Sequence, residues 1–186
     1  MTRTLVLGGA RSGKSALAER LARAADKEVV YVATSSAGDG EMSDRIAHHR
    51  ARRPADWRTV EEPTALAATL RALCAPGRIV LVDCLTLWLT NLMFSTHQDY
   101  PEVGPIDLAP LFHAERAALL AWLDEPPAGD VVFVSNEVGM GIVPYGAISR
   151  AFVDEAGRLH QDVAARVERV LFVAAGLPLA LKGAPC

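Results

Sequence analysis

The stretch GGARSGKS, residues 8–15, decides the fold predicted for this chain. It matches the pattern G-x-x-x-x-G-K-[ST]. The apolar run TLVLGG leads into it, and the segment KSALAERLARAA, with apolar residues at helical spacing, follows it. A strand, a glycine-rich turn and a helix in this order form the context in which the pattern binds phosphates. The chain is therefore predicted to bind a nucleoside triphosphate.

In such a phosphate-binding loop, or P-loop, glycines let backbone N–H groups turn toward phosphate oxygens, and the start of the helix adds partial positive charge. Lys14 is expected to act in catalysis at the β- and γ-phosphates, and the Ser15 hydroxyl to bind Mg2+. A chance glycine-rich turn is the alternative, which the full pattern at the first strand–helix junction argues against. The expected nucleotide contacts in the loop are Gly8, Gly9, Ala10, Arg11, Ser12, Gly13, Lys14 and Ser15.

Outward from the loop, short apolar runs alternate with helix-like segments. EVVYVAT, RIVLVDC, VVFVSN and RVLFVAAG are nearly continuous hydrophobic runs, which are typical of strands buried on both faces. Helices are expected at 63–73, 108–124 and 149–167, LPLALK is expected to be a further short strand, and 37–58 and 95–110 are expected to be irregular excursions. The alternation predicts one α/β domain, 1–186, with a mostly parallel sheet flanked by helices, of the P-loop NTPase-like (RecA-like) class.

The run RIVLVDC ends in an acidic residue, Asp83. A P-loop needs an acid on a neighbouring strand to hold the water shell of the metal. We therefore expect Asp83 to support catalysis and, with Ser15, to bind Mg2+. Strands also end in Asp at ordinary turns, so this role depends on the motif upstream.

Composition sets limits on the class of protein. The chain has 186 residues, a net charge of -3, and 51% hydrophobic and 22% charged residues, which indicates one globular domain and argues against a nucleic-acid partner. Its three cysteines show no metal-binding or disulfide spacing, as expected for reduced thiols in the cytoplasm. No apolar run approaches the roughly 20 residues of a membrane span.

The motifs that identify a GTPase, N-K-x-D and D-x-x-G, are absent at the expected places. GGARSGKS, YVATS, RIAHHRARRPADWRTVEEP, DCLTLWLTNLM and SNEVGMGIVP occur instead, in this order, over nearly the whole chain. Together they resemble the bifunctional adenosylcobinamide kinase / adenosylcobinamide-phosphate guanylyltransferase family of cobalamin biosynthesis. The resemblance continues through the last predicted strands.

The resemblance implies two reactions on a corrinoid. A nucleoside triphosphate, ATP or GTP, phosphorylates adenosylcobinamide. GTP then gives GMP to a histidine, His48 in this sequence, which passes it on to form adenosylcobinamide-GDP. The resemblance also implies a homotrimer. Ala33, Thr34, Ser35, His49, Arg50, Ala51, Arg52 and Glu61 are the further nucleotide contacts expected at matching positions.

The chemistry of the segment DRIAHHRARRP, residues 44–54, suits this role. A neutral imidazole, with an ordinary pKa of about 6.5, is a competent nucleophile at neutral pH. Arginines such as Arg50, Arg52 and Arg53 can stabilise the pyrophosphate that leaves. Asp44, one helical turn before His48, is a candidate for orienting the imidazole. Two alternatives stay open from the residues alone: a solvated basic helix without chemistry and, less favoured by adjacent side chains about 100° apart, a metal site.

Other features are less specific. Residues 136–144 suit a substrate loop or a plain strand-to-helix turn. Trp88 and its apolar neighbours are expected in the core or at a subunit contact, and His97, His113 and His160 are interpreted as surface or structural residues. Relatives often have Glu at the position of Asp83. The alternative functions are a P-loop small-molecule kinase without guanylyl transfer and a nucleotide-binding regulatory protein.

Overall fold

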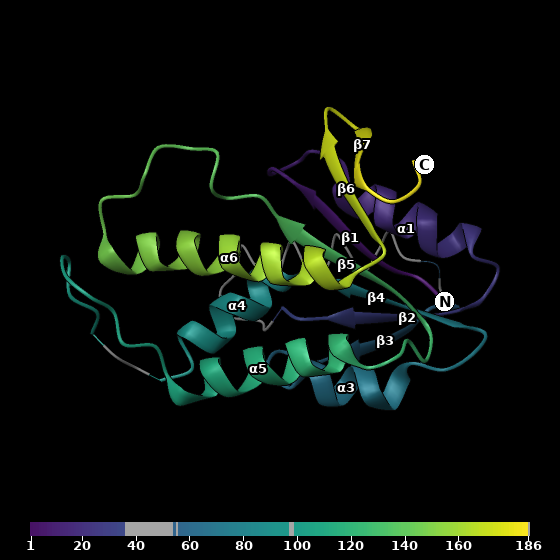
Figure 1. Cartoon of the computed structure of the whole chain (residues 1–186), viewed down its shortest axis with the longest axis horizontal. Coiled ribbons are helices and arrows are strands. Elements are labelled where there is room, and N and C mark those ends of the chain that lie inside the picture. Colours follow the sequence, from purple (N-terminus) through teal and green to yellow (C-terminus); the bar gives the residue numbers. More distant parts are fainter. Residues whose placement is uncertain (36–53, 55, 97–98, 186) are drawn as a thin grey trace.

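The computed structural model describes residues 1–35, 54, 56–96 and 99–185. These residues form one seven-stranded sheet in the order β3-β2-β4-β5-β1-β6-β7. All neighbouring strands are parallel except β6 and β7, which are antiparallel. The predicted α/β class with a mostly parallel sheet is confirmed (Figure 1). The elements are β1 (Arg3–Gly8), α1 (Lys14–Ala24), β2 (Glu28–Ala33), β3 (Arg58–Glu61), α3 (Leu66–Leu73), β4 (Arg78–Asp83), α4 (Leu85–Met93), α5 (Pro110–Asp124), β5 (Asp130–Asn136), α6 (Ala147–Arg166), β6 (Arg169–Ala174) and β7 (Leu177–Lys182).

The two faces of the sheet carry separate cores. α3, α4, α5 and α6 cover one face, where Trp88, Phe112 and Phe133 are fully or almost fully buried. α1 covers part of the other face and buries Leu17 together with Trp57 against the sheet. Since the central strands are covered on both sides, they read as continuous apolar runs rather than alternating ones. Trp88 lies in the core, as one of the two interpretations predicted.

The helices begin where local capping allows. α1 starts after Gly13, whose φ of 97° lies in the left-handed region that favours glycine. α3 begins at Leu66 rather than at residue 63, because the Glu62 carboxylate accepts the backbone N–H groups of Thr64 and Ala65 ahead of it. α5 begins at Pro110, a residue suited to the first helical turn, and α6 begins two residues before the prediction.

One strand was missed. β3 has the sequence RTVE, pairs with β2 at the edge of the sheet, and is largely exposed. A short polar edge strand shows neither an apolar run nor alternation, so the sequence offered no signal for it. The short strand predicted from LPLALK is confirmed as β7. No helix in the described ranges is long and apolar enough to cross a membrane.

Candidate active site

The P-loop joins β1 to α1 at the carboxyl edge of the parallel strands. Gly8 ends β1, and a Cβ at this position would lie 2.5 Å from Ser12 Oγ and 2.6 Å from Val173 O. The loop thus turns back so closely that only glycine fits at its first position. Arg11 and Gly13 both have positive φ, at 55° and 97°, which turns the backbone between them toward the space above the helix.

Neighbouring elements hold this loop in place. Gly176, in the turn between β6 and β7, donates its N–H to Ser12 O over 2.8 Å. Glu137, just beyond β5, donates its N–H to Gly8 O over 3.0 Å. The phosphate cradle therefore has a defined shape that the strands on both sides of β1 support.

Lys14, the first residue of α1, is directed over the loop. Its side chain is largely buried, and Nζ donates to Gly9 O over 3.2 Å. Burial lowers the pKa of Lys14, while the nearby Cys84 and Asp83 act in the opposite direction. Ser15 follows in the first turn of α1 and is half-buried. An ammonium and a hydroxyl thus lie at the start of the helix, where phosphates and their metal bind in P-loop proteins.

Asp83 ends β4 at the same edge of the sheet, and its Oδ2 accepts the Tyr31 hydroxyl over 2.8 Å. The prediction that this acid lies on the strand neighbouring β1 was wrong. β5 lies between β1 and β4, so the two strands are about 10 Å apart. Asp83 nevertheless acts on the pKa of Lys14, because the carboxyl ends of parallel strands share one edge.

The end of β2 contributes structure as well as candidate contacts. Thr34 is fully buried, and its Oγ1 donates to Cys84 O over 2.7 Å and accepts from Cys84 N over 2.8 Å. The hydroxyl expected to contact nucleotide thus ties β2 to β4. Ala33 is buried in register with both Asp83 and Glu61. Glu61, Ala33 and Asp83 therefore form a row across three strand ends, and the half-exposed Ser35 follows.

A thiol lies in the site without being a nucleophile. Burial, reinforced by Asp83, raises the pKa of Cys84 to about 11, so the thiol stays protonated at neutral pH. Its Sγ lies 3.0 Å from Thr86 Oγ1, which also accepts from Asn136 Nδ2 over 2.9 Å. Sequence reasoning missed this link from the β4–α4 turn to the end of β5.

A second polar group joins β5 to α6. His160 is buried, its Nε2 lies 2.7 Å from Ser135 Oγ, and its Nδ1 lies 3.8 Å from Glu137 Oε2. Burial lowers the pKa of His160 below its ordinary value, and the nearby Glu137 opposes this shift only in part. His160 is thus structural, one of the two predicted interpretations, and His113 is exposed on α5. The only sequence feature that pointed to this cluster of Ser135, Glu137 and His160 was the Asn-Glu pair at 136–137, which follows the apolar run VVFVS.

Several predicted site residues cannot be placed. His48, the expected carrier of GMP, lies outside the described residues. The same holds for the other residues of its segment and for one further histidine: Asp44, His49, Arg50, Ala51, Arg52, Arg53 and His97.

Comparison with solved structures supports the fold assignment. The chain is similar to a prototypical ATPase from the type III secretion system of pathogenic bacteria, with a TM-score of 0.57 and 12% identity, over 96% of this chain and 56% of that one. It is also similar to the type III secretion ATPase EscN from enteropathogenic E. coli, with a TM-score of 0.55 and 13% identity, over 94% of this chain and 43% of that one. The chain thus shares the fold of these ATPases.

Sequence comparison identifies the family. The family model described as cobinamide kinase / cobinamide phosphate guanyltransferase matches residues 4–181. The bifunctional adenosylcobalamin biosynthesis protein CobP of Pseudomonas aeruginosa is 59% identical, over 98% of this chain and 99% of the relative. The corresponding CobU protein of Escherichia coli K12 is 43% identical, over 96% of this chain and 98% of the relative. The chain belongs to the cobinamide kinase / cobinamide phosphate guanyltransferase family.

Proposed function

We propose that this chain phosphorylates adenosylcobinamide with a nucleoside triphosphate and then transfers GMP from GTP, through His48, to form adenosylcobinamide-GDP. The proposal depends chiefly on one observation: Lys14 and Asp83 converge on a preformed P-loop at one edge of the sheet. Family membership supplies the substrate class.

In the kinase step, the P-loop holds the triphosphate and the acceptor hydroxyl attacks the γ-phosphorus. A bond forms between that hydroxyl oxygen and phosphorus, the hydroxyl proton is released to solvent, the bond to the bridging oxygen breaks, and a nucleoside diphosphate leaves. Lys14 stabilises charge on the β- and γ-phosphates, as the backbone N–H groups of the loop do. The neighbouring Cys84 thiol, with its pKa raised to about 11, does not compete as a nucleophile.

The donor set of the site fits Mg2+. Within the part of the chain that the structure describes, no group of three or more His, Cys, Asp or Glu residues could cage a metal. Mg2+ needs no such cage, because it binds through one or two protein oxygens together with phosphates and waters. Ser15 would provide a hydroxyl, and Asp83 would hold metal-bound water with the lone pairs that Tyr31 leaves available. The ion would neutralise phosphate charge.

In the transfer step, an imidazole nitrogen of His48 attacks the α-phosphorus of GTP. A P–N bond forms, and the bond from the α-phosphorus to the bridging oxygen breaks, which releases pyrophosphate. A phosphate oxygen of adenosylcobinamide phosphate then attacks the same phosphorus, and the P–N bond breaks. Arg50, Arg52 and Arg53 are proposed to stabilise the negative charge that develops on the leaving group.

Incubation with GTP labelled at the α-phosphorus tests the transfer step. We expect label on the protein that is labile in acid and stable in base, as a phosphoramidate is, and that is lost in His48→Ala. Loss of label in His49→Ala with retention in His48→Ala would contradict the assignment of His48. Absence of label in the unmodified protein would favour a kinase without guanylyl transfer.

We also propose that the chain acts in the cytoplasm as a homotrimer. The support in the described residues is β7, an edge strand on which Leu177, Leu179 and Leu181 are 73%, 61% and 58% exposed. Exposed leucines on a sheet edge favour contact with another copy. Light scattering tests this, and a monomeric mass at micromolar concentration would contradict it.

A further inference from the structure

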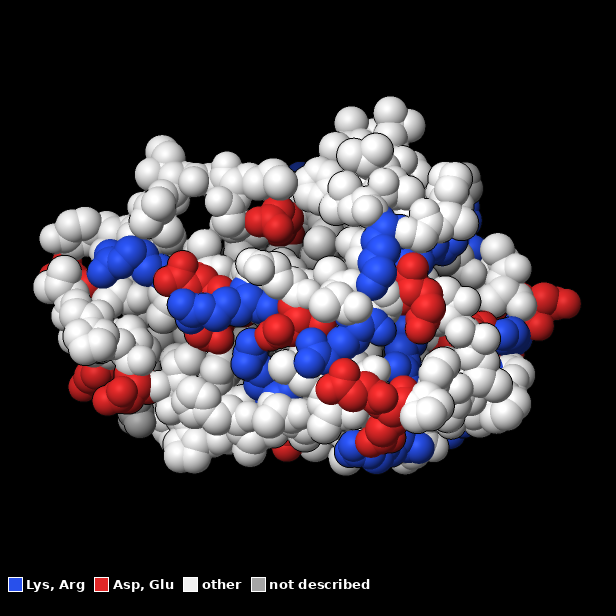
Figure 2. Space-filling model, viewed as in Figure 1, with Lys and Arg blue, Asp and Glu red and all other residues white. Residues whose placement is uncertain are grey.

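The loop between β5 and α6 exposes an unusual amount of apolar surface. Residues 138–146, VGMGIVPYG, include no charged residue. Met140, Ile142, Val143 and Tyr145 are 78%, 97%, 74% and 76% exposed. In Figure 2 charged side chains gather across α5 and α6, whereas the projecting edge that this loop forms is almost entirely white. Adjacent exposed apolar side chains of this kind mark an interaction site.

The backbone of this loop is held at several points. Glu137 Oε1 accepts the N–H of Gly139 over 2.6 Å at its start. At its end the Arg150 guanidinium donates to Pro144 O over 3.2 Å and to Tyr145 O. The apolar side chains are therefore presented by an ordered backbone, which reduces the entropy lost when a ligand binds.

A hollow lies between the loop and the first turns of α6. Its volume is about 280 Å³, and Val138, Ile142, Pro144, Arg150, Val153 and Asp154 are among the residues that line it. Its lining combines apolar side chains with polar groups, as the lining of a small-molecule site does. Arg150 fastens the loop, whereas the exposed Asp154 carboxylate can accept hydrogen bonds from a ligand.

The loop is continuous with the phosphate site. Asn136, the last residue of β5, is in register with Gly8, and the N–H of Glu137 bonds to Gly8 O over 3.0 Å. A kinase acceptor must bring its hydroxyl to within about 3–3.5 Å of the phosphorus. The rest of a large acceptor must then lie on a surface that flanks the P-loop, as this loop does.

We infer that residues 138–146, with the hollow behind them, bind the corrinoid acceptor. The identity of this acceptor depends on the proposed function. A corrinoid is a broad, methyl-bearing macrocycle edged with amide side chains. Its apolar face fits Ile142 and Val143, and its amide N–H groups fit Asp154. The hollow is below the ~300–1,000 Å³ typical of a site that encloses a drug-sized ligand, so it accepts one edge of the macrocycle while the exposed loop contacts the remainder.

The test is steady-state kinetics with adenosylcobinamide. In the double variant Ile142→Ser/Val143→Ser, we expect KM for adenosylcobinamide to rise at least about tenfold, with KM for ATP unchanged. Asp154→Ala should raise the corrinoid KM about threefold. Since both loop side chains are mostly exposed, the double variant should keep the melting temperature of the unmodified protein. Leu111→Ser, on α5, is the matched control and should leave both KM values unchanged.

Two results would overturn the inference. One is a corrinoid KM that the double variant leaves unchanged. The other is a smaller mass of the double variant in light scattering, which would show that a second copy covers the loop. Labelling of the protein by GTP in the absence of corrinoid is a separate readout. If no label appears, the transfer step of the proposed function is contradicted. The KM values of the kinase reaction still decide the role of the loop.

Discussion

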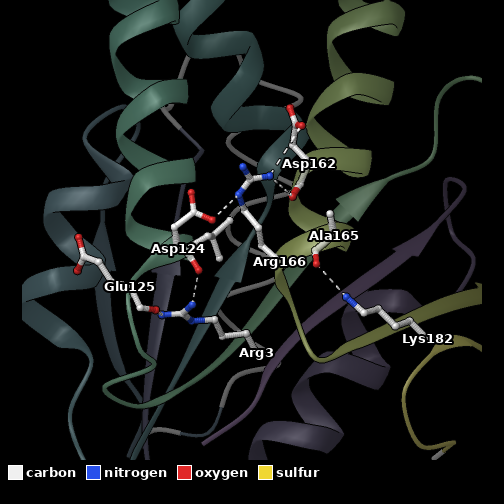
Figure 3. A network of polar contacts seen from close by, with 8 residues as sticks. Arg3, Asp124, Glu125, Asp162, Ala165, Arg166 and Lys182 are labelled. Atoms are coloured by element: carbon white, nitrogen blue, oxygen red, sulfur yellow. Dashed lines mark hydrogen bonds and ion pairs between the residues drawn. The ribbon is translucent and has the colours of Figure 1, made fainter.

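The two ends of the parallel sheet differ in how they use polar groups. At the amino edge Arg3 is only 2% exposed and donates to Leu123 O over 2.6 Å and to Glu125 O over 2.8 Å (Figure 3). Its guanidinium also lies 4.5 Å from the centre of the Trp122 ring. These contacts fasten the first strand to the end of α5.

Further contacts extend this amino-edge network to α6 and β7. Arg166 donates to Asp124 Oδ1 over 2.9 Å and to Asp162 O over 3.0 Å. Lys182 donates to Ala165 O over 3.1 Å, near the end of α6 (Figure 3). Charged side chains here bind helix carbonyls and one another, which joins four elements.

At the carboxyl edge the polar groups converge on one place. Lys14 lies over the P-loop, Asp83 faces the same edge, and apolar side chains of the 138–146 loop are exposed beside them. The comparison shows that one sheet separates the two tasks: contacts at its amino end stabilise the fold, and groups at its carboxyl end are available to a substrate.

The largest effect should come from Lys14→Met. We expect both activities to fall at least about 1,000-fold, because the ammonium stabilises phosphate charge. The free energy of unfolding should stay the same or rise, since burial lowers the pKa of Lys14 and a neutral side chain avoids that desolvation. Initial rates and urea denaturation measure the two quantities. Lys182→Met at the amino edge is the matched control, and an equal loss of rate in it would contradict the separation.

Arg3→Met should show the opposite pattern. We expect a loss of about 2–3 kcal/mol in the free energy of unfolding, because one buried and one partly buried carbonyl group lose their donor. The kcat/KM of the folded enzyme should stay within about twofold of the original value. Urea denaturation and kinetics in the absence of urea are the measurements. A stability loss below about 1 kcal/mol would show that the amino-edge network is not a main contributor.

Alkaline pH should act on the carboxyl edge through Cys84. Burial raises the pKa of this thiol to about 11, so the folded state keeps the proton that the unfolded state loses near pH 9. The contribution of Cys84 to the free energy of unfolding is therefore complete below pH 9. It falls by at most about 3 kcal/mol as the pH rises to about 11. Denaturation curves at pH 8 to 11 should show a smaller decrease in Cys84→Ala. Equal slopes in the two proteins would contradict this role.

The smallest effect should come from His160. Burial lowers its pKa, so the unfolded state binds a proton that the folded state resists as the pH falls below about 6.5. The contribution of His160 to the free energy of unfolding is therefore complete above that pH and decreases below it. Thermal denaturation between pH 7.5 and 5.5 should show a weaker pH dependence in His160→Gln, which keeps an amide partner for Ser135. A slope as steep as that of the original protein would show that His160 does not contribute.

Local pattern was sufficient for some of these features. The strand, turn and helix around residues 8–15 and the apolar run that ends in Asp83 were predicted, because each depends on residues close together in the sequence. The exposed polar strand β3 was not, since no local pattern distinguishes it from a loop. The bonds of Thr34 to Cys84 join residues that are 50 positions apart, and no spacing rule predicts such a pair.

By itself, the sequence determined the P-loop, since the conformation of a glycine-rich turn is a property of its own backbone angles. It also determined the family, because its motifs follow one another in order along the chain. The tertiary structure alone decided that β5 lies between β1 and β4 and that an apolar loop flanks the phosphate site. The reason is physical: strand order and loop placement depend on contacts between distant residues, which are settled only when the whole sheet packs.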